Sequence, residues 1–182
     1  MKEQLQKDFE NTIRNLSLSQ KDIEIKKFSL DNFINKGFPN RKEEDWKFSD
    51  LNQIINKNIG ELSFYNDYTS TNKVDTSVFV DGLEHNKIVF INGRIEKIDF
   101  DYEKKGQIEI IDQSETINKF DNNNSLSDLN NAFTNKCFKI VIKTGYQLLK
   151  PLIIYHTTNS KIWSKNINLR LDFELQDDSC LR

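Results

Sequence analysis

Proline and cysteine are both scarce in this chain, with two of each among 182 residues, and there are only six glycines. Cys137 and Cys180 lie far apart and have no CxxC or Cys/His spacing around them. The chain therefore lacks the clustering typical of a metal site or a disulfide framework, and we expect both cysteines to be ordinary, half-buried strand residues. The glycines are scattered singly and match no phosphate-binding pattern, so the sequence indicates no nucleotide site.

Long hydrophobic runs and an excess of one charge are also absent. The apolar runs, such as Ile153–Tyr155, are only a few residues long, whereas a membrane-spanning helix needs about 20. The formal net charge is −2, which gives no support to nucleic-acid binding. The amino terminus has acidic residues in its first ten positions and no apolar segment of a signal peptide. We therefore expect a cytoplasmic protein with neither a membrane segment nor a nucleic-acid partner.

Residues 1–60 have the pattern of a helical region. Apolar residues at spacings of four, four and three form one stripe of an amphipathic helix: Leu5, Phe9, Ile13 and Leu16. We expect a second helix that begins at the capping residue Ser29 and ends at Gly37, before Pro39. Ser49 is expected to cap a third helix. Helices this short are not stable alone, so they must pack on a larger core.

Residues 61–135 combine loops with short helices and strands. Asn92 and Gly93 separate two apolar segments and are the pair best suited to a two-residue turn, which predicts a hairpin over residues 87–98. Residues 107–111 are expected to form another short strand. Residues 125–133 begin with a capping serine and place Leu126, Leu129 and Phe133 on one face, which predicts a short helix.

Residues 136–182 have the pattern of strands only. Apolar and polar residues alternate over 138–142, a second strand follows Pro151, and residues 166–175 alternate without interruption. A last strand would begin at Ser179 and stop at Arg182, which leaves a sheet edge with unpaired backbone groups. We therefore expect the 182 residues to be the amino-terminal part of a longer protein.

Residues suited to catalysis do not form a recognisable constellation. We expect His85 in a polar turn and His156 at a strand end, both at the surface, with no nucleophile and orienting acid beside either. The adjacent acids of residues 43–45 point in different directions, which is typical of a solvated face. Trp46 and Phe48 would suit base stacking, but the three acids beside them would repel phosphate. These residues therefore mark out no catalytic site.

The segment Gly37–Leu51, GFPNRKEEDWKFSDL, has the most specific pattern in the chain. It resembles the amino-terminal signature of the SufB/SufD family of the SUF iron–sulfur cluster assembly system, in particular that of its SufD members. Phe48 stands where the family more often has tyrosine. The residues in register are Pro39, Arg41, Lys42, Glu44, Trp46, Lys47, Phe48, Ser49 and Leu51. Three further segments are similar to family segments in the same order: IVFINGRIEK at 88–97, SLSDLNNAF at 125–133 and KPLIIYHTT at 150–158.

The resemblance implies an α+β fold in which a helical amino-terminal region precedes a right-handed parallel β-helix, with residues 136–182 as its first turns. It implies a non-enzymatic scaffold that supports assembly of a nascent iron–sulfur cluster with a SufB-like subunit and the ATPase SufC. The family's cluster-site histidine and its SufC-contacting helices correspond to regions expected beyond Arg182. The resemblance therefore assigns no catalytic, cofactor or metal residue to this chain, and we expect it to bind no cofactor by itself.

Two other functions are compatible with the same patterns. A carbohydrate-binding or carbohydrate-processing β-helix protein would also stack short alternating strands, but the polar side of residues 166–175 has no acids except Asp172 and Glu174, and Trp163 lies just outside. A free-standing adaptor would need a partner to cover the sheet edge after Ser179. On physical grounds alone, residues 37–51 are expected to be a connector between helices, with Trp46 and Phe48 as apolar anchors and the charges toward water.

Overall fold

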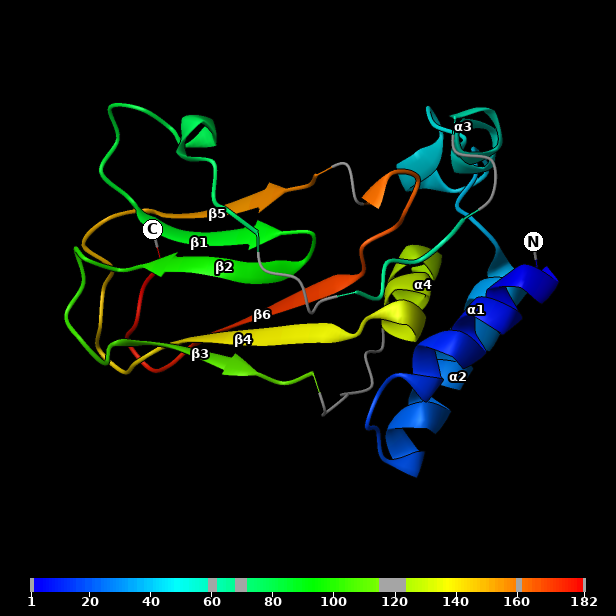
Figure 1. The fold of residues 1–182 in the computed structure, drawn as a ribbon, viewed down its shortest axis with the longest axis horizontal. Coiled ribbons are helices and arrows are strands. Elements are labelled where there is room, and N and C mark those ends of the chain that lie inside the picture. Colours follow the sequence, from blue (N-terminus) through cyan, green and yellow to red (C-terminus); the bar gives the residue numbers. More distant parts are fainter. Residues whose placement is uncertain (1, 59–61, 68–71, 115–123, 160–161, 182) are drawn as a thin grey trace. The chain divides into compact units, whose positions relative to one another are not determined.

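The computed structural model describes residues 2–58, 62–67, 72–114, 124–159 and 162–181, and Figure 1 shows their helices and strands. The chain forms two compact units. The helical unit comprises residues 1–66, 114–135 and 164–169, and the sheet unit comprises residues 67–113, 136–163 and 170–182. Each unit therefore combines segments that are distant in the sequence. The helix at residues 125–133 belongs with the amino-terminal helices.

The helical unit has one apolar core. Its described helices are α1 (Lys2–Arg14), α2 (Gln20–Lys36), α3 (Leu51–Asn58) and α4 (Ser125–Phe133). The buried core residues are Leu5, Phe9, Leu30, Phe33, Phe38, Ile55, Leu62, Ala132 and Phe133. The ring of Phe133 stacks on that of Phe64 with centroids 3.6 Å apart and meets Phe9 edge to face at 6.2 Å. The apolar faces predicted for α1 and α4 are thus buried in the same core.

Three of these helices are capped by residues other than the predicted ones. The caps are Ser19 for α2, Asp50 for α3 and Asn124 for α4, whose side-chain oxygens accept backbone N–H groups of the first turn at 3.2, 3.0 and 2.9 Å. The predicted cap Ser29 was wrong, because it lies inside α2 and is buried. Ser49 and Ser125 each lie one residue from the actual cap. Serine, aspartate and asparagine cap helices about equally well, so residue type does not rank neighbouring candidates.

A buried lysine joins α2 to the end of α4. Lys26 is 1% exposed, and its Nζ donates to the carbonyl oxygens of Asn131 at 3.1 Å and Ala132 at 3.4 Å, and also to that of Thr134. These carbonyls lie at the carboxyl end of α4, where backbone acceptors lack partners within the helix and the helix dipole is negative. The lysine therefore supplies both the hydrogen bonds and the charge that this helix end requires.

The first sheet of the sheet unit has the strand order β2-β1-β5 (Figure 1). β1 (Asn86–Ile91) and β2 (Arg94–Asp99) form the predicted antiparallel hairpin, with φ of 52° at Asn92 and 80° at Gly93. β5 (Leu152–Thr157) lies parallel to β1 on its other side. On one face of this sheet, Val89, Ile91 and Tyr155 form a small buried cluster.

The second sheet has the order β3-β4-β6, with bounds Ile108–Asp112, Lys136–Ile142 and Leu169–Leu175. β3 is antiparallel to β4, and the central strand β4 buries Ile140 and Ile142. β6 begins at Leu169, later than the alternation of residues 166–175 predicts. The strand expected after Ser179 is reduced to an isolated bridge between Cys180 and Gln147.

The described residues contain no β-helix, so the expectation that residues 136–182 form its first turns was wrong. Over that part of the chain the fold is α+β, with four helices and two mixed sheets of three strands each. In a β-helix, strands stack in parallel rows over successive coils, whereas here each sheet contains an antiparallel pair, β1-β2 and β3-β4. Apolar alternation indicates a half-buried strand but not the direction of its neighbours, which is why the sequence pattern suggested the wrong architecture.

The carboxylate of Glu103 holds the connection between β4 and β5 by hydrogen bonds. Glu103 accepts hydrogen bonds from the Tyr146 hydroxyl at 2.7 Å, the Asn86 amide at 2.6 Å and the backbone N–H groups of Leu149 and Lys150 at 3.1 Å each. Burial raises the pKa of Glu103, but these hydrogen bonds outweigh burial and hold the pKa below its ordinary value. The ionised carboxylate therefore stabilises the folded sheet unit.

We predict that Phe133→Ala lowers the free energy of unfolding by about 3–5 kcal/mol, because it removes a fully buried ring and leaves a cavity. Phe48→Ala is the matched control: Phe48 is 87% exposed, and its loss should change stability by less than about 0.5 kcal/mol. Urea unfolding followed by circular dichroism measures both values. Equal losses in the two variants would contradict the assignment of Phe133 to the core.

A second prediction concerns pH. The folded pKa of Glu103 lies below the ordinary value of 4.5, so its stabilising effect is complete above that value and is lost as the pH falls through the folded pKa. Glu103→Gln should therefore lower the melting temperature at neutral pH, and the difference from wild type should shrink between about pH 5 and pH 3. Asp81→Asn, at an exposed position, is the control. A difference that is constant with pH would refute the role of the ionised carboxylate.

Candidate partner-binding loop

The segment Gly37–Leu51, whose sequence resembles the family signature, begins with residues that are buried in the helical core. Gly37 ends α2 as predicted, with φ of 73° and an N–H that donates to the carbonyl oxygen of Phe33 at 2.7 Å. Phe38 is 3% exposed, and its ring packs edge to face on that of Phe33 with centroids 5.0 Å apart. Pro39 is buried as well. The start of the loop is therefore fixed by the core.

Hydrogen bonds within the loop hold residues 40–49 in successive turns. The backbone oxygen of Asn40 accepts the N–H of Glu43 at 3.0 Å, and its side-chain oxygen accepts the N–H of Lys42 at 3.0 Å. A single 3₁₀ turn follows at Glu44–Trp46, and the Ser49 N–H donates to the Trp46 oxygen at 2.8 Å. The loop is thus ordered by its own bonds, and its side chains have a defined arrangement.

The far end of the loop is also attached to the helical core. Leu51 is the first residue of α3 and packs against the buried core. Asp50 caps the same helix through the N–H of Gln53. Of the matched signature residues, Pro39 and Leu51 therefore lie at the two anchored ends, and the charged ones lie between them.

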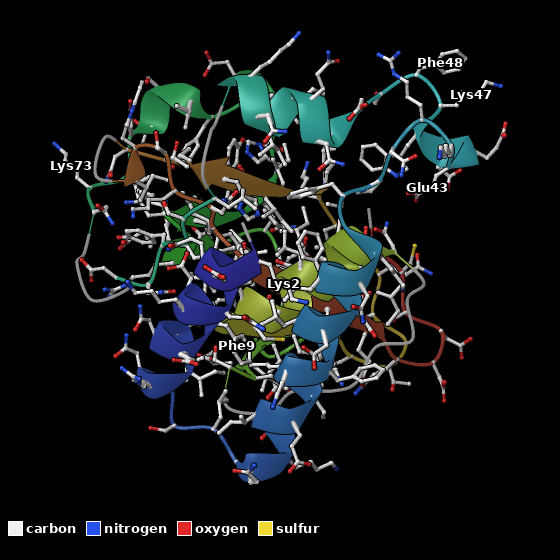
Figure 2. The ribbon with its side chains drawn as sticks, turned by 90° about the vertical axis from the view of Figure 1, so that its right-hand side faces the viewer. Lys2, Phe9, Glu43, Lys47, Phe48 and Lys73 are labelled. Carbon is white, nitrogen blue, oxygen red and sulfur yellow. The ribbon has the colours of Figure 1, made fainter. Side chains whose placement is uncertain are left out.

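The sequence predicts Trp46 and Phe48 as apolar anchors of the loop, and this is wrong for Phe48. Phe48 is 87% exposed, and Trp46 is only partly buried. Figure 2 shows Phe48 and Lys47 projecting away from the helices. Phe38 provides the anchor instead. The segment contains three aromatic residues close together, and which of them meets the core depends on the turns between them rather than on residue type.

The charged side chains of the loop differ in how far they are engaged. The Nζ of Lys47 lies 3.5 Å from Oε1 of Glu44 and 5.2 Å from the centroid of the Phe48 ring. Glu43 turns back to accept the backbone N–H of Asn40 at 3.3 Å. Arg41 and Lys42 are exposed, and within the described part of the chain neither forms an ion pair. Two cationic groups are therefore available to a partner.

Groups suited to catalysis do not meet in or near this loop. It contains no histidine, cysteine or activated hydroxyl, and its acids are exposed or engaged locally. Nowhere in the described ranges do three or more His, Cys, Asp or Glu side chains gather as a metal site would require. Cys137 is buried in β4 and Cys180 is exposed, and both are free thiols. In the part of the chain that the structure describes, no helix combines the length and apolarity needed to cross a membrane.

The two histidines lie in the sheet unit and have separate surroundings. His85 is 2% exposed, with Nδ1 2.6 Å from the Leu83 oxygen and Nε2 2.7 Å from the Tyr155 hydroxyl. The expectation of a surface position was wrong for His85, because Tyr155 of β5 contacts it. His156 is exposed and stacks on Phe90 with centroids 4.8 Å apart, and partial desolvation of the imidazole lowers the pKa of His156. Tyr155, which contacts His85, and His156 are consecutive residues of β5 and point to opposite faces of the sheet. The two imidazoles are therefore not brought together.

Comparison with known proteins adds no relative. No family model matches the chain, and no curated protein matches it. The resemblance of residues 37–51 and the three later segments to the SufB/SufD family therefore depends on their residues alone.

Trp46→Ala gives a third prediction. A fully buried tryptophan would cost about 3–5 kcal/mol on truncation, but Trp46 is only partly buried, so we expect a loss of about 1–2 kcal/mol. Phe38→Ala, at the actual anchor, should cost about 3–5 kcal/mol. Urea unfolding of the two variants gives the comparison. A larger loss for Trp46→Ala than for Phe38→Ala would contradict this assignment of the anchor.

Proposed function

We propose that the chain is a non-enzymatic scaffold subunit of the SUF iron–sulfur cluster assembly machinery, of the SufD-like type within the SufB/SufD family. Its role is to provide surface to a complex in which a SufB-like subunit and the ATPase SufC are the partners. The nascent cluster is the cargo of that complex. ATP is hydrolysed by SufC and not by this chain, and the complex works in the cytoplasm.

The observation that supports this proposal is that the four family-like segments are neighbours in pairs. The loop at 37–51 and helix α4 place Phe38 and Phe133 in one buried core. The hairpin at 88–97 and the segment at 150–158 place β1 beside β5, with Ile88 opposite Ile154 in parallel register. In each unit, two segments that resemble the same family therefore also pack on each other. Isolated chance similarities in loops would have no reason to do so.

One further feature agrees with a scaffold role. The signature residues Arg41, Lys42, Glu44 and Lys47 are exposed on a loop with anchored ends, so they present surface and hold no reacting group. The SufB/SufD resemblance and the carbohydrate alternative both implied a β-helix over residues 136–182, and the described residues there form none. The proposal is therefore based on the four family-like segments and not on that architecture.

A free-standing adaptor is the second candidate. The 87% exposure of Phe48 on an ordered loop favours it, because such a loop can bind a partner outside the SUF system. The two candidates differ in the cellular process that fails when the chain is absent.

The experiment is disruption of the gene in its own organism. We expect the specific activity of aconitase, which needs a [4Fe–4S] cluster, to fall severalfold while the amount of aconitase polypeptide is unchanged. Malate dehydrogenase, which has no cluster, is the control, and reintroducing the gene should restore activity. Unchanged aconitase activity would reject the SUF assignment and leave the adaptor.

A further inference from the structure

Residues 40–48 form an exposed, ordered surface in which one aromatic ring is surrounded by charged groups. We propose that this surface binds another protein, and that the partner presents an apolar pocket for Phe48 with carboxylates at its rim. The proposal concerns the chemistry of a partner site and does not depend on which complex contains the chain. It therefore goes beyond the scaffold role proposed above.

Phe48 has the properties of an interface anchor. It is 87% exposed, although moving a phenylalanine side chain out of water lowers the free energy. The turn that precedes Phe48 is closed by the bond from the Glu43 N–H to the Asn40 oxygen at 3.0 Å, and the turn that contains Phe48 is closed by the bond from the Ser49 N–H to the Trp46 oxygen at 2.8 Å. Because the loop is already ordered, binding requires little further loss of conformational entropy. Large side chains seated in a partner's pocket dominate the binding energy of protein interfaces, so Phe48 is the expected centre of contact.

The charged residues around Phe48 indicate which groups lie at the rim of the partner's pocket. Arg41 and Lys42 are exposed and form no ion pair among the described residues. Lys47 lies over the Phe48 ring and pairs with Glu44, whose side chain is 90% exposed. An exposed pair of this kind contributes little, so Lys47 can exchange Glu44 for a carboxylate of the partner. Arginine and lysine beside a buried aromatic anchor are complementary to carboxylates, which they bind by charge-assisted hydrogen bonds.

The same loop argues against nucleic acid as the ligand. Glu43, Glu44 and Asp45 lie within the surface and would repel a phosphate backbone. The three acids balance Arg41, Lys42 and Lys47, so the loop has no net positive charge with which to attract a polyanion. A protein can place a few carboxylates beside Arg41 and Lys42 and keep them away from the three acids, whereas a uniform polyanion cannot.

The test replaces Phe48 by the photo-crosslinking analogue p-benzoylphenylalanine in the full chain, produced in its own organism. Trp163, which is 84% exposed and lies in the sheet unit, is replaced in the same way as the matched control. We expect position 48, but not position 163, to crosslink to one protein. Mass spectrometry should map the crosslink to apolar residues flanked by Asp or Glu. Adding the double substitution R41E/K42E should reduce the crosslink yield at least tenfold, while circular dichroism shows an unchanged fold.

The crosslinked protein, once purified, allows a quantitative measurement. Phe48→Ala should weaken its binding about 30-fold and Trp163→Ala less than about twofold, as expected for an anchor and a residue outside the interface. The proposal is overturned by the absence of a crosslink specific to position 48, by a crosslink to nucleic acid, or by a yield insensitive to R41E/K42E. If the protein is not a SUF component, the docking surface stands and the SUF assignment loses support.

Discussion

Aromatic packing around Phe133 is the contact on which the helical unit depends. Phe133 is the last residue of α4, and its ring meets those of Phe64 and Phe9 with centroids 3.6 and 6.2 Å away. Short helices are unstable alone, so α1 and α4 exist because this core joins them. Lys26 strengthens the arrangement by donating to carbonyl oxygens at the end of α4. The same core includes Phe38 and therefore holds the start of the exposed loop.

The loop has two ends attached to the core and a middle part that is exposed to solvent. Phe38 and Leu51 attach its two ends to the core, and hydrogen bonds close the turns between them. This frame leaves Phe48 and the cations Arg41 and Lys42 exposed to solvent. This combination suits a binding surface, because side chains that are already in place lose less conformational entropy when a partner binds. The structural and the proposed functional parts of the loop are thus different residues of one segment.

Residue types predicted well where a helix ends and where the chain turns. Gly37 ends α2, and Asn92-Gly93 turns the hairpin, because both positions need positive φ and few residue types adopt it. The helix at Ser125–Phe133 follows from its apolar spacing. The start of α2 was missed because residues 20–28 have few apolar positions, although Ser19 is a good cap. Nothing in the local sequence marks Glu103 or Lys26, whose partners are distant residues.

Local sequence was thus sufficient for the turns, for most of the helices and strands, and for the segment that carries the family resemblance, because φ preferences and apolar periodicity act over a few residues. The sequence was insufficient for strand direction, for the burial of His85 and for the choice of Phe38 over Phe48 as anchor. Each of these depends on contacts between segments far apart in the chain, such as β5 beside β1 and Tyr155 against His85. Long-range packing selects among local possibilities that residue types leave equal, and the exposure of Phe48 is a result of that selection.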